Sequence, residues 1–138
     1  MPSPASLRVL VVDDQETMRW IVQGHLKTLG ITRVFQAESA NAAIEMLKSQ
    51  KYDLILSDFN MDNGSGLDLL KSVRGNPLTK KLPFIMVTGN ADAETVQAVM
   101  KAGVNNYIVK PFTPTVLQDK LAETLQRVGL AMPVPQTV

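Results

Sequence analysis

Five polar side chains stand at the ends of short apolar runs in the sequence, and their types suit phosphoryl transfer. Asp13 and Asp14 follow one run and Asp58 follows a second. Thr88 and Lys110 follow two further runs. Clustered carboxylates are the oxygen ligands that Mg²⁺ prefers, and a hydroxyl and an ammonium group can pair with phosphoryl oxygens. If the fold brings these groups together, we predict a Mg²⁺ site with Asp58 as its nucleophile.

The apolar runs predict the strands of a parallel β-sheet. They are continuous and rich in Val and Ile, which is typical of strands covered on both faces. The segments between them carry apolar residues at helical spacing, which predicts five helices. Gly30 and Gly103 suit the C-terminal caps of the first and fourth helices. The predicted strands are residues 9–12, 34–37, 54–57, 84–87 and 107–109.

The alternation of strands and helices predicts a doubly wound α/β fold, with helices on both faces of the sheet. Ligands of such a sheet bind beyond the carboxyl ends of its strands. Any one acid alone is more simply a turn residue, so the prediction rests on the convergence of the whole set at that edge. Asp13, Asp14 and Asp58 then become candidate Mg²⁺ ligands, and the backbone carbonyl of Asn60 could join them.

Length and composition indicate one globular domain. The chain has 138 residues, of which 45% are hydrophobic and 20% charged, and its net charge is +1. This balance gives no overall field that would favour nucleic acid or an anionic membrane. The lack of cysteine excludes disulfides and thiolate catalysis, and it agrees with a reducing compartment. Without a signal peptide or long apolar span, we expect a cytoplasmic protein with no membrane insertion.

Four motifs carry a family resemblance. They are Val11-Val12-Asp13-Asp14, Ser57-Asp58-Phe59-Asn60-Met61, Val87-Thr88-Gly89 and Val109-Lys110-Pro111-Phe112. With these motifs, residues 7–129 resemble the receiver domains of two-component response regulators, and most of all those of single-domain chemotaxis regulators. Residues 1–6 and 130–138 are then expected to be flexible ends.

The resemblance implies the flavodoxin-like strand order 2-1-3-4-5 and a role for each site residue. Asp58 would accept a phosphoryl group from a histidine kinase, while Asp13 and Asp14 hold Mg²⁺. Thr88 would sense the phosphate and Lys110 would pair with it. The domain would thus be a phosphoacceptor switch with slow loss of its own phosphate, and not a classical enzyme.

The resemblance also implies a switch and an output surface. Tyr107 resembles an aromatic residue whose rotamer follows activation, and the Lys110–Pro111 bond is expected to be cis. A protein target would bind the face made by the fourth helix, fifth strand and fifth helix. The flagellar motor switch is the expected target, and we expect a monomer before phosphorylation. A phosphorelay intermediate and a regulator of another enzyme are the alternative outputs.

Three features depart from the family pattern. The segment Asp62–Gly66 has two glycines where the family commonly has a proline and then a Met-Asp-Gly run, so we expect a more flexible loop. Gly89 follows Thr88 where a small residue with a β-carbon is usual. Glu123 lies near a position that is often basic in chemotaxis regulators, which counts against a motor target.

Two rival functions use similar folds. Haloacid-dehalogenase-like phosphohydrolases also combine an aspartyl nucleophile with Mg²⁺, but they carry an acidic proton donor two residues after it. This chain has Asn60 there, and an amide cannot donate and accept that proton. A flavin-binding domain would need a hydroxyl-rich phosphate loop after the first strand. Asp13 and Asp14 stand there instead and would repel a flavin phosphate.

Four other features have simpler interpretations. His25 is the only histidine and is given no role, so the phosphodonor should be another protein. Trp20 lies beside the apolar stripe of the first helix, and we expect partial burial rather than a partner contact. Segment 63–66 lacks the lysine and spacing of a P-loop and should be a turn into the third helix. Lys80 and Lys81 should be a solvated pair, too small for a nucleic-acid site.

Overall fold

The computed structural model describes residues 6–61, 64–89 and 92–127. The two expected flexible ends therefore lie outside the described residues, except for Ser6. Asp62 and Asn63, from the glycine-rich loop, also lie outside them. None of the described helices is long and apolar enough to cross a membrane.

The main sheet has five parallel strands in the order β2-β1-β3-β6-β7. In chain order of these five strands this is 2-1-3-4-5, so the predicted fold class and strand order are confirmed. The predicted boundaries are within one residue of those observed. The strands are β1 (Arg8–Val12), β2 (Arg33–Ala37), β3 (Leu54–Asp58), β6 (Phe84–Thr88) and β7 (Asn106–Val109).

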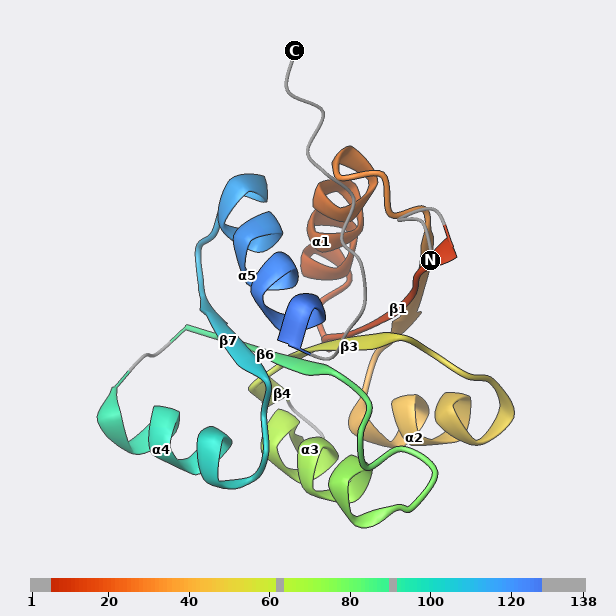
Figure 1. Ribbon diagram of the computed structural model, residues 1–138, viewed down its shortest axis with the longest axis vertical. Helices are drawn as coiled ribbons and strands as arrows, with labels where there is room; N and C mark the ends of the chain where they lie inside the picture. The colour runs from red at the N-terminus through yellow and green to blue at the C-terminus, as the bar shows by residue number, and fades with distance from the viewer. Residues whose placement is uncertain (1–5, 62–63, 90–91, 128–138) are drawn as a thin grey trace.

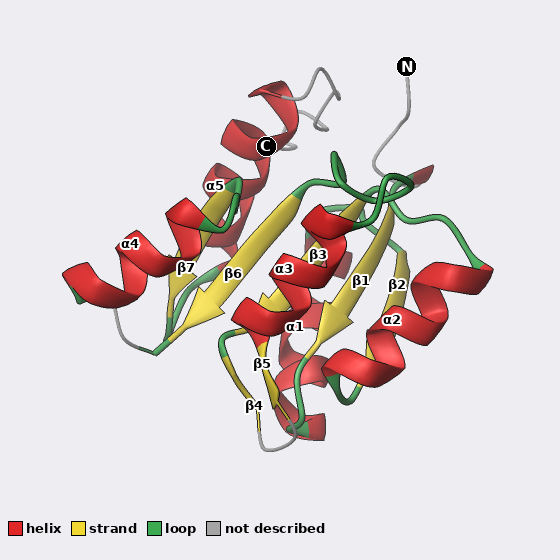
Figure 2. Cartoon of the chain, turned by 90° about the horizontal axis from the view of Figure 1, so that it is seen from below, coloured by secondary structure: helices red, strands yellow, loops and turns green. Residues whose placement is uncertain are grey.

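Five helices cover the sheet on both faces, and Figure 1 shows α1 and α5 on one face with α2, α3 and α4 on the other. Figure 2 shows that the strand arrows point toward one common end of the sheet. The helices are α1 (Glu16–Thr28), α2 (Ala40–Ser49), α3 (Gly66–Gly75), α4 (Ala93–Lys101) and α5 (Pro114–Arg127).

Alternate residues of the central strands supply two separate cores, one on each face of the sheet. In β1, Val9 and Val11 pack with α1 and α5, whereas Leu10 and Val12 pack with the other three helices. Side chains of a strand alternate between faces, so one strand can anchor both layers. The expectation of double coverage holds for β1, β3 and β6. It fails for the two edge strands, since β2 is half-exposed and β7 is only partly buried.

Glycines end two helices in the way the sequence predicts. Gly30 and Gly103 have φ angles of 87° and 96°, in the left-handed region that favours glycine. At the first cap, the amide of Gly30 donates to the Lys27 carbonyl and that of Ile31 to the Leu26 carbonyl. The cap at Gly103 repeats this pattern, so both helices end in a Schellman motif and turn sharply into the next segment.

Segment 63–66 was predicted to be a simple turn, and the described part of it is more ordered than that. A two-stranded antiparallel hairpin, β4 (Asn60–Met61) with β5 (Gly64–Ser65), follows Asp58. Helix α3 then starts at Gly66, and the Ser65 hydroxyl accepts a 3.1 Å hydrogen bond from the Asp68 amide. Hairpin pairing and an N-cap therefore hold Gly64, Ser65 and Gly66 in defined contacts, and the greater flexibility expected of the whole segment stays a prediction.

Gly66 is required because of close packing. A β-carbon there would lie 2.2 Å from the carbonyl oxygen of Asp58 and 2.8 Å from the Met86 sulfur. The Gly66 amide also donates a 2.9 Å hydrogen bond to the Phe59 carbonyl. The start of α3 is therefore pressed directly against the backbone of the candidate site.

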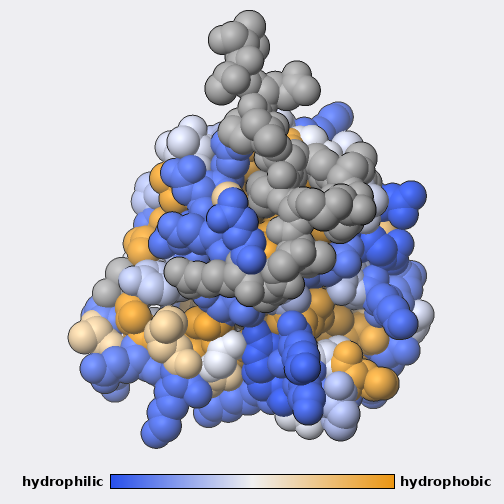
Figure 3. Space-filling view, viewed as in Figure 1, coloured by the Kyte–Doolittle hydropathy of each residue, from blue (hydrophilic) through white to orange (hydrophobic). Residues whose placement is uncertain are grey.

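The two aromatic residues of α1, Trp20 and His25, differ in exposure. Trp20 is 58% exposed, so the expectation of partial burial is wrong; its indole N–H donates a long hydrogen bond of 3.4 Å to Glu16. His25 is half-buried and packs edge-on against Phe112, with ring centroids 5.7 Å apart. Figure 3 shows that one face of the molecule is largely hydrophilic, with apolar residues reaching the surface in separate patches.

Replacing Gly66 by alanine should destabilise the fold, because the new methyl group has no room beside the Asp58 carbonyl. We expect the free energy of unfolding to fall by about 1–3 kcal/mol in a urea titration. The matched control is Gly24→Ala, where the added β-carbon meets nothing within 4 Å on an exposed helix. That control should gain up to about 1 kcal/mol. Equal effects of the two changes would contradict the packing argument.

Candidate functional site

Sheet register brings the acids of two neighbouring strands together. Val12 of β1 is paired with Ser57 of β3, so Asp13 and Asp58, one residue further on, lie side by side at the end of these strands. Asp13 is 5% exposed and Asp58 8%, while Asp14 is half-buried. Carboxylate oxygens of all three lie within 4.8 Å of one another. The structure therefore gathers the predicted acids into one cluster.

Lys110 bridges the two buried acids. Its ammonium nitrogen lies 2.8 Å from Asp58 Oδ1 and 3.7 Å from Asp13 Oδ2. The Lys110 amide donates a 2.8 Å hydrogen bond to the Thr88 carbonyl, which ties the end of β7 to that of β6. The following peptide bond, Lys110–Pro111, is cis, the geometry that the resemblance implied. One cation beside three carboxylates leaves an excess of negative charge at the cluster.

The pKa of the Asp13 carboxyl is raised at this site. Burial raises its pKa above 3.8, and the 2.9 Å hydrogen bond from the Gln15 amide lowers it. The Asp58 charge raises the pKa again, and the Lys110 charge lowers it. The net result is a raised pKa, so ionised Asp13 is held at a cost to the fold. A divalent cation would remove this cost, and an all-oxygen donor set of this kind fits Mg²⁺.

The remaining predicted residues lie at different positions along the chain relative to the cluster. Thr88 is buried at the end of β6, one residue beyond Val87, which is paired with Asp58. Asn60 is exposed in β4, two residues after Asp58. Tyr107 is half-buried in β7 and paired with Met86, so it stands two residues back from this edge. Thr88 thus lies next to the acids along this edge of the sheet, whereas Tyr107 lies further back and packs against the core beneath α2, α3 and α4.

Sequence reasoning missed a polar clamp behind the acids. A guanidinium nitrogen of Arg19 donates a 2.7 Å hydrogen bond to the Asp13 carbonyl, and its Nε donates to Gln36 Oε1 at 3.0 Å. Gln36 in turn donates to Gln23. The clamp fixes the loop that carries Asp13 and Asp14 against α1 and β2. An arginine within a helix is ordinarily a surface cation, so the sequence held no signal for this contact.

Replacing Asp13 by asparagine should stabilise the metal-free protein, because it removes a buried charge and keeps an oxygen for the Gln15 amide. The folded pKa of Asp13 is raised, so its ionisation destabilises the fold above that pKa. The gain in free energy of unfolding should be largest near neutral pH and disappear as the pH falls through the raised pKa to below 3.8.

Urea unfolding in the presence of a chelator at several pH values measures this gain. The same change should weaken Mg²⁺ binding at least about tenfold, since it removes a charged ligand. A variant less stable than the wild type at neutral pH would contradict the charge-crowding account.

Comparison with known proteins identifies the family of the chain. Residues 9–122 match the family of the response regulator receiver domain. The chain is 40% identical to the chemotaxis protein CheY of Pseudomonas aeruginosa over 123 residues, which are 89% of this chain and 99% of that one. It is also 40% identical to CheY-3 of Vibrio cholerae over 122 residues, 88% of this chain and 94% of that one.

Solved structures show the same fold. The CheY4 structure of Vibrio cholerae superposes with a TM-score of 0.81 at 31% identity, covering 86% of this chain and 98% of that one. The receiver domain of the Pseudomonas aeruginosa sensor kinase PA1611, with a magnesium ion in its active-site cleft, gives a TM-score of 0.79 at 27% identity. That match covers 87% of this chain and 98% of the other. By family match, identity and fold together, the chain belongs to the response regulator receiver domains and is similar to the CheY proteins of chemotaxis.

Proposed function

We propose that this chain is a phosphorylation-activated switch in which Asp58 accepts a phosphoryl group from a histidine kinase. The observation that carries the proposal is the contact of Lys110 with Asp58, at 2.8 Å, inside a cluster of three carboxylates. An acid that is both buried and paired with a cation at the carboxyl edge of a parallel sheet is a candidate nucleophile. Membership of the receiver family supports the assignment.

The transfer itself needs little from the protein except position and charge. A carboxylate oxygen of Asp58 attacks the phosphorus of the donor's phosphohistidine, and the P–N bond breaks. The electron pair stays on the imidazole nitrogen, which then takes a proton from water. Lys110 orients the carboxylate before transfer and is placed to pair with a phosphoryl oxygen afterwards. Asn60 cannot act as a general acid, so the aspartyl phosphate should be lost slowly.

Mg²⁺ is the cofactor that the donor set fits. The carboxylates of Asp13, Asp14 and Asp58 would hold it together with the backbone carbonyl of Asn60. When bound, Mg²⁺ neutralises charge that develops on the phosphoryl oxygens. The magnesium ion in the PA1611 receiver structure supports this choice of metal. Arg19 would keep the Asp13–Asp14 loop in place for the ion through its bond to the Asp13 carbonyl.

Activation would be read on the face formed by α4, β7 and α5. The phosphate adds a charge of about −1.5 to −2 beside Thr88, whose hydroxyl would turn toward it. Tyr107 would then change rotamer, leaving the Lys120 ammonium that now lies 5.3 Å from its ring centroid. Met100, Val109 and Val116 are exposed apolar residues of these three elements, and they support a protein target there.

The expected output is chemotaxis, through the flagellar motor switch. The 40% identity with two proteins named as chemotaxis proteins supports this output over a phosphorelay or an enzyme regulator. Glu123, which departs from the usual basic residue, accepts a 2.9 Å hydrogen bond from the Asn106 side chain. Its carboxylate is thus partly engaged with β7, which reduces the repulsion that its charge would exert on an acidic target. Before phosphorylation the protein should be a cytoplasmic monomer.

Replacing Asp58 by asparagine should abolish phosphorylation, because an amide oxygen is a very weak nucleophile. We expect no label on the variant after incubation with Mg²⁺ and acetyl phosphate, measured as the mass increase of intact protein. The control is Asp68→Asn, an exposed aspartate in the first turn of α3, which should be labelled like the wild type. Full labelling of the Asp58 variant would refute the proposed acceptor.

Replacing Lys110 by glutamine should separate metal binding from phosphoryl transfer. Loss of a positive charge next to the acids should tighten Mg²⁺ binding by about fivefold, measured by calorimetry. The rate of phosphorylation should fall by at least about tenfold, because the phosphoryl oxygens lose their ammonium partner. Lys27→Gln, at an exposed position of α1, is the matched control and should change neither value. Weaker Mg²⁺ binding by the Lys110 variant would disprove the view that the Lys110 charge opposes binding of the metal ion.

A further inference from the structure

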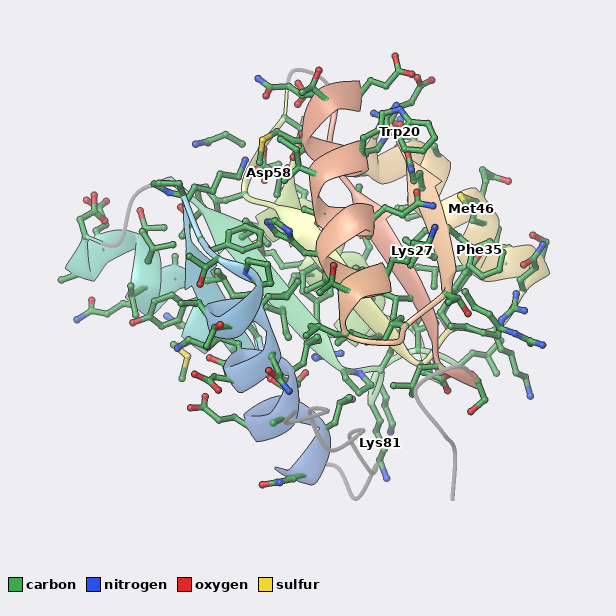
Figure 4. The ribbon with its side chains drawn as sticks, turned by 90° about the horizontal axis from the view of Figure 1, so that it is seen from above. Trp20, Lys27, Phe35, Met46, Asp58 and Lys81 are labelled. Carbon is green, nitrogen blue, oxygen red and sulfur yellow. The ribbon has the colours of Figure 1, made fainter. Side chains whose placement is uncertain are left out.

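A hollow of about 750 Å³ lies far from the acidic cluster. It is formed by the C-terminal end of α2, the segment that connects α2 to β3, and the segment that connects α3 to β6. These segments lead into the amino ends of β3 and β6, whereas Asp58 stands at the carboxyl end of β3. Figure 4 shows Asp58 and Lys81, which lines the hollow, at opposite ends of the molecule. The hollow is therefore separate from the phosphoacceptor site.

The charge around this hollow is of one sign. Four lysines line it, and no acidic residue is among the described residues that do. Lys80 and Lys81 also line a neighbouring hollow of about 450 Å³ together with Arg74. Among the described residues, Arg74 donates to uncharged oxygens: the carbonyls of Leu82 and Gly103 and the side-chain oxygen of Asn105. One of the four positive charges is offset, because Lys48 forms an exposed ion pair with Glu45. The other three lysines that line the hollow are Lys51, Lys80 and Lys81.

An apolar anchor stands at the rim of the hollow. Leu78 is 92% exposed, although large apolar side chains are normally covered. Two hydrogen bonds close the turn that carries it: the Leu78 amide donates to Asn76 Oδ1 at 2.9 Å, and the Thr79 amide donates to the Asn76 carbonyl at 3.0 Å. The Thr79 hydroxyl is fixed to the Val73 carbonyl at 2.8 Å. A preformed turn reduces the entropy lost when a partner covers Leu78.

One residue that lines the same hollow carries a buried hydroxyl. Tyr52, 8% exposed, lines it, and its hydroxyl has no hydrogen-bond partner among the described residues. Buried polar atoms are normally paired, so an unpaired one indicates a place where an additional polar group would be favourable. The walls of the hollow are otherwise largely apolar, with Leu47, Leu78 and Leu82 among them. A ligand that suits this surface must carry both apolar and negatively charged groups.

The positive charge of the hollow favours some binding partners over others. A second copy of the chain would bring the same lysines against each other across a twofold axis, which disfavours self-association. A nucleic-acid duplex would meet the lysines through its phosphates but would leave Leu78 and the apolar walls uncovered. We propose that the hollow and Leu78 dock an acidic segment of a partner protein, one that carries large apolar residues between its carboxylates.

This docking surface should work regardless of phosphorylation. Its lining residues include none of the acidic cluster and none of β7 or α5. The partner would thus hold the receiver in place, while the α4–β7–α5 face stays free to report the phosphate. The proposal stands on the hollow alone, so it can fail or succeed independently of the role of Asp58.

A peptide titration followed by backbone amide NMR tests the proposal on the full chain. The probe is a synthetic peptide of repeated Glu-Glu-Leu-Phe units, and we expect shifts at residues 48–52 and 76–82 with a Kd of about 1 mM or tighter. Leu78→Ser should weaken binding about fivefold, as should the double change Lys80→Gln with Lys81→Gln. Lys27→Gln, at an exposed site outside the hollow, should leave the Kd unchanged. Adding beryllofluoride with Mg²⁺ should also leave it unchanged.

Control ligands separate charge from apolar contact. The same peptide with glutamine in place of glutamate, and one with serine in place of Leu and Phe, should each bind about fivefold more weakly. The proposal is overturned if shifts centre on the α4–β7–α5 face or are absent at about 5 mM peptide. It is also overturned if a DNA duplex binds residues 76–82 more tightly than the peptide does.

Discussion

Repulsion among three carboxylates at one edge of the sheet is the constraint on which the rest of the structure depends. Asp13 and Asp58 are almost fully buried, and their oxygens lie within 4.8 Å of each other and of Asp14. Lys110 relieves only part of this repulsion. The remaining charge makes the site ready for a divalent cation and a phosphoryl group, at a cost to the stability of the metal-free fold.

The fold holds the acids in place through contacts on every side of them. The two cores, one on each face, fix β1 and β3 in a register that leaves Asp13 beside Asp58. Arg19 holds the Asp13 carbonyl from α1, and Gly66 brings the start of α3 against the Asp58 carbonyl. A site built on strand ends and supported from three elements can keep like charges close without local rearrangement.

Much of this could be predicted from the sequence, because strand ends and helix caps are local signals. Asp13, Asp58, Thr88 and Lys110 each follow an apolar run, and parallel strands must bring such residues to one edge. The cis bond at Lys110 came from family resemblance alone. Other features depend on tertiary contacts that no local pattern encodes: the Arg19 clamp, the β4–β5 hairpin, the exposure of Trp20 and the basic hollow beside Leu78.

The covalent phosphate is expected on Asp58, and locating the modified residue tests this assignment most directly. Borohydride reduces an aspartyl phosphate to homoserine, which peptide mass spectrometry can place in the sequence. After phosphorylation with Mg²⁺ and acetyl phosphate, we predict homoserine at position 58 and unchanged aspartate at Asp13 and Asp14. Homoserine at either of those positions, or at neither them nor 58, would contradict the account.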